Sequence, residues 1–119
     1  MLPITSHKDL IVWRKAIALA SKVYAATRQL PSDERFGLTA QLRRAVVSVP
    51  SNIAEGAGRN GAKEFLNFIG ISRGSLAELE TQLQLVVMLG FAAPDHPAFE
   101  MANSTGKLLT GLHEKLSTT

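Results

Sequence analysis

Apolar residues recur at intervals of three and four in four separate segments of this chain, which is the spacing of one face of an α-helix. The four stripes occupy residues 10–27, 38–53, 65–86 and 102–116. No segment alternates between apolar and polar residues with a period of two, as a half-buried strand would. We therefore expect an all-α chain, and its 119 residues suffice for one domain with a buried core.

Proline, glycine and capping residues predict where these helices begin and end. Pro31 disfavours the helical conformation at the residue before it, and Gly90 followed by Pro94 ends the third helix. The residues expected at helix starts are Ser32 or Asp33, Asn60, and Asp95 with Pro97 in its first turn. The expected helices span roughly residues 8–29, 33–57, 61–90 and 96–116 of a single domain, residues 1–119. Because the connections are short, neighbours should run antiparallel, as in an up-down four-helix bundle.

Pro50 lies within the second apolar stripe and has two interpretations. In a continuous helix it removes one backbone hydrogen bond and clashes with the carbonyl of Val46, which kinks the helix. Alternatively the helix breaks there and restarts, with Asn52 and Glu55 as a capping pair. We favour the kink, because the apolar stripe keeps its register across the proline.

Two helices carry more apolar surface than a small monomer buries. The first has two neighbouring stripes, one through Trp13 and Tyr24 and one through Val12. Such a surplus predicts an interface between subunits. In the third helix, Gly70 and Gly74 share one face. We expect another backbone to approach them closely, because each glycine costs a helix about 1 kcal/mol.

The composition is that of a globular protein of the cell interior. Apolar residues make up 45% of the chain and charged residues 19%, which separates it from disordered chains. The chain has no cysteine, so disulfides and zinc–thiolate sites are excluded. The first residues do not resemble a signal peptide, and the longest apolar run, residues 85–94, is about half of a membrane span. We expect a cytoplasmic protein without a membrane segment.

Charge is distributed unevenly over the two halves of the chain. Residues 1–63 contain ten basic and four acidic residues, whereas residues 64–119 contain three basic and six acidic ones. The basic half predicts a polyanionic partner, or docking onto the acidic half of a neighbouring copy. The alternative is that the helices simply have unequally charged solvated faces.

The segment from Gly56 to Gly61 reads G-A-G-R-N-G, the spacing of a dinucleotide-binding loop. That loop needs a preceding strand within a βαβ unit, and here the preceding segment is helical. A P-loop is disfavoured as well, because Ala62 and Lys63 follow Gly61 where a lysine and a hydroxyl residue are required. We therefore interpret the glycines as a helix end and a permissive turn, and expect no cofactor.

Neither a metal site nor a catalytic site is indicated. A di-iron bundle requires Glu-x-x-His pairs, and no glutamate stands three residues before His7, His96 or His113. Glu78 and Glu80 are two residues apart, so they point to different sides of a helix. No nucleophile motif is found. The pattern favours a protein that is not an enzyme and has no catalytic, cofactor-binding or metal-binding residues.

Eight basic residues of the first half are candidates for contacts with nucleic-acid phosphates: Arg14, Lys15, Lys22, Arg28, Arg43, Arg44, Arg59 and Lys63. Arg43 and Arg44 follow Leu42, so at least one of them flanks the buried stripe, where Glu55 or Glu78 is the expected partner. No sequence-reading motif accompanies these residues, and the aromatic side chains lie on core stripes. Binding would therefore be electrostatic, with little readout of the base sequence.

Four stretches together resemble the family of 23S ribosomal RNA intervening-sequence proteins: DLIVWRKA (9–16), FGLTAQLRRAVVSVPSNIAEG (36–56), KEFLNFIGISRGSLAELETQL (63–83) and MLGF (88–91). The resemblance implies an antiparallel four-helix bundle that assembles into a ring-like homopentamer. It also implies kinship with the accessory variability determinant of diversity-generating retroelements. That relative binds nucleic acid through basic surface residues and works alongside a reverse transcriptase.

Two functions remain open on this sequence. The first is binding of RNA or DNA by a homo-oligomer whose basic surfaces act together. The second is a protein-interaction scaffold, such as an accessory subunit for a reverse transcriptase. Binding to random nucleic acid distinguishes them, because counterion release gives a steep dependence on salt.

Overall fold

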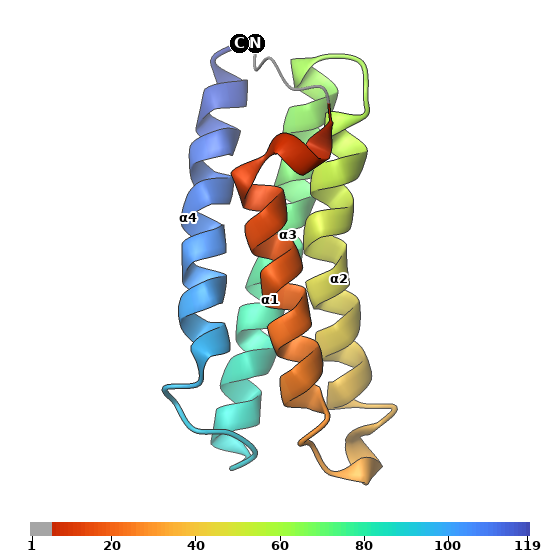
Figure 1. Ribbon diagram of the computed structural model, residues 1–119, viewed down its shortest axis with the longest axis vertical. Coiled ribbons are helices and arrows are strands. Elements are labelled where there is room, and N and C mark those ends of the chain that lie inside the picture. Colours follow the sequence, from red (N-terminus) through yellow and green to blue (C-terminus); the bar gives the residue numbers. More distant parts are fainter. Residues whose placement is uncertain (1–5) are drawn as a thin grey trace.

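The computed structural model describes residues 6–119, which fold into helices and connecting turns (Figure 1). The four α-helices are α1 (Ile11–Thr27), α2 (Leu38–Ala57), α3 (Ala62–Met88) and α4 (Pro97–Ser117). The short 3₁₀ helices η1 (His7–Asp9) and η2 (Ser32–Glu34) precede α1 and α2. The all-α class is thereby confirmed, and the first five residues of the expected domain lie outside the described residues.

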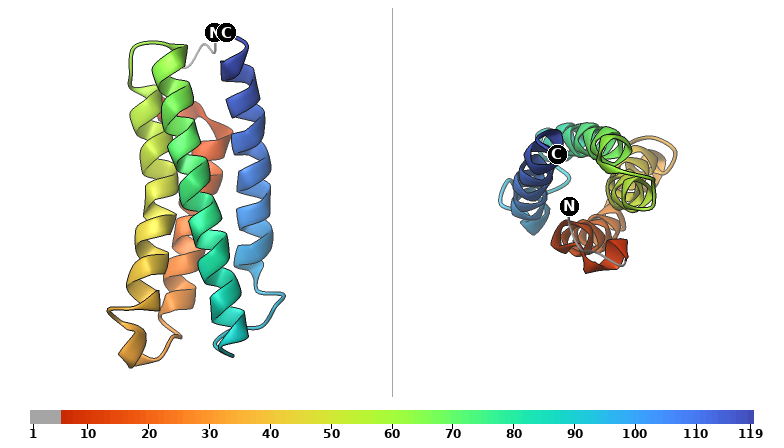
Figure 2. Two further views of the ribbon diagram at one scale, coloured as in Figure 1. Left: turned by 180° about the vertical axis from the view of Figure 1, so that it is seen from behind. Right: turned by 90° about the horizontal axis from the view of Figure 1, so that it is seen from above.

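The helices form an antiparallel up-down bundle. Each packs against its neighbour in sequence, and α4 closes the bundle against α1. Viewed from above, the four helices surround one core, with α1 and α3 diagonally opposite each other (Figure 2). The outer faces of α1 and α3 therefore point to opposite sides of the molecule.

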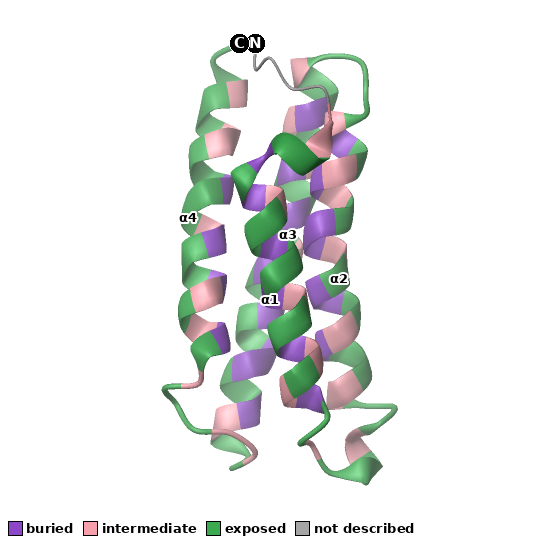
Figure 3. Ribbon diagram, in the orientation of Figure 1, coloured by how far each residue is buried: buried purple, intermediate pink, exposed green. Residues whose placement is uncertain are grey.

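The core takes one stripe from each helix, and in α1 it is the stripe through Val12, Leu19 and Val23 (Figure 3). Trp13 is only half-buried at the edge of the core, and Ile17 is 43% exposed. The expectation that the Trp13 stripe is a core stripe holds only in part: Leu10 and Thr27 are buried and Trp13, Ala20 and Tyr24 pack against the core from its edge, but Ile17 lies outside it. The reason is geometric: α1 lies between α2 and α4, and only the side between them faces inward.

α2 is continuous through Pro50, so the alternative of a break and restart is wrong. Asn52 does not cap a new helix, because its Nδ2 donates back to the carbonyl of Ser48 at 2.8 Å. Hydrogen bonds to α3 lie beside the proline: Ser72 Oγ donates to the carbonyl of Val49 at 2.8 Å. These bonds tie the two helices together where the proline interrupts the backbone ladder.

The start of α2 is capped by a residue that the sequence did not indicate. Ser32 and Asp33 lie within η2, so neither caps α2. The helix begins after Gly37, and Glu34 Oε1 accepts the N–H of Leu38 at 3.1 Å. The turn that follows Pro31 occupies five residues more than expected, and its glutamate satisfies the first free N–H of the helix.

Two further capping predictions are wrong by one residue each. Gly61, not Asn60, is the residue that precedes α3. Its φ is +105°, a backbone conformation that glycine adopts readily and other residues do not. His96, not Asp95, precedes α4, and its Nδ1 accepts the N–H of Ala98 at 3.1 Å. Pro97 at the first position of α4 is confirmed. The end of α3 is also confirmed: Gly90 has a φ of +81° just after the helix.

Candidate nucleic-acid interface

The outer face of α1 carries cations on a helix that itself contains no carboxylate; the acidic residues near them lie on other elements, such as Glu100 of α4, which lines a surface pocket together with Lys15. Arg14, Lys15 and Lys22 lie within the helix and Arg28 directly follows it, and all four are exposed. α1 contains no aspartate or glutamate. The two ion pairs found within residues 6–119 involve other arginines. We call these four residues the α1 surface; the exposed side of α1 faces the viewer in Figure 3.

Local structure holds one of these side chains and leaves the others in solvent. Arg14 donates from Nε to the carbonyl of Lys8 at 3.0 Å and from Nη2 to that of Asp9 at 3.2 Å, which secures η1 against α1. Lys15 and Lys22 are two helical turns apart, on one side of α1, and about 10 Å apart along its axis. A row of such cations suits a phosphate backbone, whose charges repeat along a line.

Arg43 belongs to the packing between α1 and α2. Its Nε donates to Thr27 Oγ1 at 2.9 Å, and its guanidinium lies 4.6 Å from the centre of the Tyr24 ring. The Thr27 hydroxyl in turn donates to the carbonyl of Tyr24 at 2.8 Å. These contacts fasten the end of α1 to α2, so a phosphate would have to compete with them.

Two candidate arginines are paired with carboxylates. Arg44 lies 3.4 Å from Glu78 of α3, which confirms Glu78 as a partner, whereas Glu55 pairs with Arg59 at 3.1 Å. Exposed pairs of this kind add at most about 1 kcal/mol to stability. They do, however, neutralise part of the charge that would attract a phosphate. Lys63 is exposed in the first turn of α3, next to Arg59 in the α2–α3 connection.

The structure thus places the eight candidate residues in three groups. Four form the α1 surface, two lie on α2 and face its neighbours α1 and α3, and two lie at the α2–α3 turn. Sequence spacing could not separate them, because the partners of Arg43 and Arg44 are distant in sequence. The α1 surface is the group in which no cation takes part in an ion pair within residues 6–119.

The glycine cluster is the joint between α2 and α3, as its sequence indicates. α2 ends at Ala57, and Gly61 provides the permissive turn before α3. Gly56 has another role: it is buried against α3, and a Cβ atom there would lie 2.7 Å from Cβ of Phe68. Its interpretation as a mere helix end is therefore wrong, since it lets the two helices approach each other.

Potential metal ligands are dispersed. Within residues 6–119, histidines and carboxylates form no group of three or more that could hold an ion. His7 packs edge-on against Trp13 with 5.0 Å between ring centres, and His96 caps α4. Of the helices described, none combines the length and hydropathy that crossing a bilayer requires.

The outer face of α3 bears on the expectation of close packing at its glycines and adds a feature. Cβ atoms at Gly70 and Gly74 would meet nothing within 4 Å, so no backbone within residues 6–119 packs against them, and a close approach would have to come from another chain. Aliphatic side chains are exposed on the same helix: Ile71 by 45%, Leu85 by 44% and Met88 by 74%. We call these five residues the α3 surface. In the sequence, Gly70 and Gly74 indicated this surface, whereas the exposure of the three aliphatic residues could not be predicted.

The chain matches the family model of the 23S rRNA-intervening sequence protein over residues 8–111. It belongs to this family. The family match extends from η1 into α4 and confirms the resemblance found in four stretches of the sequence.

A crystal structure of another protein supports the fold of this 23S rRNA-intervening sequence protein. That protein, from Bacteroides thetaiotaomicron, is of unknown function and belongs to the S23 ribosomal protein family. The two chains share 20% identity with a TM-score of 0.66, over 91% of this chain and 96% of the other. Among curated proteins, none matches this chain.

Proposed function

We propose that the protein is a non-enzymatic, self-associating helical bundle that binds RNA or DNA through the α1 surface. The observation that carries the proposal is the set of exposed cations on a helix that contains no carboxylate. Such a surface attracts a phosphate backbone because binding releases the counterions of the nucleic acid. The interaction would position the protein on a strand without reading its bases.

Self-association through the α3 surface fits this proposal. The surface exposes aliphatic side chains beside two glycines that leave room for another backbone. Because α3 lies diagonally opposite α1, a contact made by the α3 surface leaves the α1 surface of the same subunit free. A ring also needs a second contact surface on each subunit, which we place on a side other than α1. The family resemblance implies a ring-like homopentamer, in which each subunit would contribute one α1 surface. Several weak electrostatic contacts would then add through multivalency.

A salt titration tests this proposal. Labelled single-stranded and duplex RNA and DNA of random sequence are titrated with the protein, and its native mass is determined in the same samples. We expect an oligomer whose affinity falls with salt at a log–log slope of about −2.7 or steeper on duplex DNA and about −2 or steeper on single strands, as three or more phosphate contacts require. An intact oligomer that binds none of these nucleic acids at low salt would overturn the proposal.

The second candidate function is a scaffold for a partner protein, such as a reverse transcriptase. The α3 surface favours it, because a partner could cover the same glycines and aliphatic side chains. In that case the purified chain would be monomeric at micromolar concentration and would bind nucleic acid only in the presence of its partner.

A further inference from the structure

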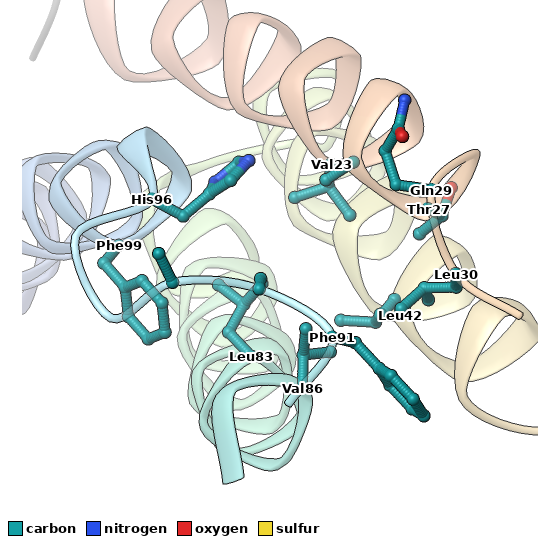
Figure 4. A pocket seen from close by; sticks show the side chains of 13 residues that line it. Val23, Thr27, Gln29, Leu30, Leu42, Leu83, Val86, Phe91, His96 and Phe99 are labelled. Atoms are coloured by element: carbon teal, nitrogen blue, oxygen red, sulfur yellow. The ribbon is translucent and has the colours of Figure 1, made fainter. Parts of the chain in front are cut away.

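A cavity of about 300 Å³ opens at the end of the bundle where α1 and α3 end and α4 begins (Figure 4). All four helices contribute apolar side chains to its walls, among them Val23, Leu42, Leu83 and Phe99. The segment 91–93 between α3 and α4 closes one side. None of the residues of the α1 or α3 surface lines it.

Few polar groups in this cavity are free to bind a ligand. The Thr27 hydroxyl already donates to the carbonyl of Tyr24 and accepts from Arg43. Gln29 also lines the cavity, but Figure 4 shows its side chain turned away from the space. The ring of His96 instead points across the cavity toward Val23. Its Nδ1 accepts the N–H of Ala98, so the neutral ring carries its proton on Nε2. That N–H is a donor available to a ligand.

Water is a poor occupant of such a space. A buried water molecule usually makes about three hydrogen bonds, and these mostly apolar walls offer few side-chain partners besides Thr27, Gln29 and His96. Displacing poorly held water by an apolar group is favourable. The volume is about twice that of a 150 Å³ cavity that admits benzene, which leaves room for a medium-length alkyl chain or two fused rings.

We propose that this cavity binds a small amphiphile with an apolar body and a terminal carboxylate that accepts a hydrogen bond from His96 Nε2. No aspartate or glutamate lines the cavity. His96 also precedes α4, and the N-terminal end of a helix favours negative charge. An ammonium group at the same place would face a donor and a positive helix end. The site is separate from the proposed nucleic-acid interface and does not depend on it.

The first test compares two probes of equal length and opposite charge, octanoate and octylammonium, below the concentration at which they form micelles. Each is titrated into the isotopically labelled full chain, and binding is followed by amide NMR shifts. We expect saturable shifts at Phe91, His96 and Ala98 with octanoate, and at least tenfold weaker binding of octylammonium. The absence of saturable shifts at millimolar octanoate, or equal affinity for both probes, would overturn the proposal.

Two matched substitutions locate the site. Ala26→Phe fills the cavity from α1, whereas Ala25→Phe adds the same ring at the neighbouring exposed position outside it. We expect the first to weaken octanoate binding at least tenfold and the second to leave it unchanged. If Ala26→Phe unfolds the bundle, Ala92→Phe fills the cavity from the α3–α4 connection instead. Unchanged octanoate binding by a folded filling variant contradicts the site.

A substitution at the imidazole tests the polar contact. His96→Ser keeps a side chain that can cap α4 but removes the Nε2 donor. We expect this variant to lose the preference for octanoate over octylammonium while its helical signal stays unchanged. A preference equal to that of the wild type would show that the carboxylate binds elsewhere.

Discussion

The outer faces of α1 and α3 lie on opposite sides of the bundle, and exposure to water costs them differently. α1 exposes four cations, which water solvates well, beside two isoleucines, Ile11 and Ile17. α3 exposes two glycines in mid-helix together with aliphatic side chains. Each exposed glycine costs a helix about 1 kcal/mol, and the aliphatic groups gain nothing from water.

An exposed surface that lowers the stability of the folded monomer indicates that another polypeptide covers it. The cations of α1 need no partner for stability, so only their charge points to a ligand. The glycines of α3 lower the stability of the isolated chain, and contact with a second polypeptide would offset that loss. The two surfaces therefore predict different kinds of partner, and substitutions should affect them independently.

The largest expected effect is a loss of DNA affinity without a change in oligomeric state. The triple variant Lys15→Glu, Lys22→Glu, Arg28→Glu should lower the affinity for duplex DNA at low salt on the order of a hundredfold, because three phosphate contacts are lost. Native mass and helical signal should stay as in the wild type. The control is the double variant Lys107→Glu, Lys115→Glu on α4, which changes charge away from the α1 surface. The triple variant changes net charge by six and the control by four, so a control whose logarithmic loss of affinity is about two-thirds of that of the triple variant would mean that net charge, and not this surface, governs binding.

The next largest effect is expected on the side of α3 that packs against α2, which differs from the exposed α3 surface. Gly56→Ala should lower the free energy of unfolding by about 2 kcal/mol, because the added Cβ would overlap Phe68 where α2 and α3 meet. Urea denaturation gives this value. A neutral result would show that the helices separate at no cost, and that their close approach at Gly56 is unimportant.

A smaller effect is expected from the aliphatic part of the α3 surface. The double variant Ile71→Lys, Leu85→Lys should weaken self-association at least tenfold, because buried apolar area would be replaced by charge. Sedimentation across a range of concentrations measures it. The helical signal should be unchanged, since both positions are solvent-exposed in the monomer. Unaltered association would place the subunit contact on another helix.

The smallest effect has opposite signs in two measurements. Gly70→Ala combined with Gly74→Ala should stabilise the monomer by about 0.5–1 kcal/mol for each glycine replaced, because both positions have open space for a Cβ. The same pair should weaken self-association, because the added methyl groups hold a neighbouring backbone away. Urea denaturation in the Ile71→Lys, Leu85→Lys background isolates the first effect. Stronger association in the alanine variant would contradict close packing at this surface.

Much of the fold could be predicted because its signals are local. Apolar spacing defines four helices, and the register kept across Pro50 predicts a continuous α2. The choice between the two stripes of α1 could not be made, because it depends on where α2 and α4 lie. The same limit applies to the helix starts, where Glu34 and His96 supply the capping groups.

The candidate interface was predictable as a set of residues but not as a surface. Arg43 and Arg44 are adjacent in sequence, yet the first bonds to Thr27 and the second pairs with Glu78. These partners lie on different helices, and no local pattern reveals which cation is neutralised. The absence of acidic residues from α1 follows from its observed start at Ile11, because the helix expected over residues 8–29 would have included Asp9.

The sequential connectivity of the bundle also sets an order in time during synthesis. α2 and α3 pair through contacts such as Ser72 with Val49, and both helices are complete once residue 88 has been added. They can therefore join while the last helix is still inside the ribosome. α4, with Phe99, docks against α1 and α3 only afterwards. The cavity at that end of the bundle needs His96 and Phe99 from the start of α4, so it is complete only after α4 has begun to emerge, later than the α1 surface.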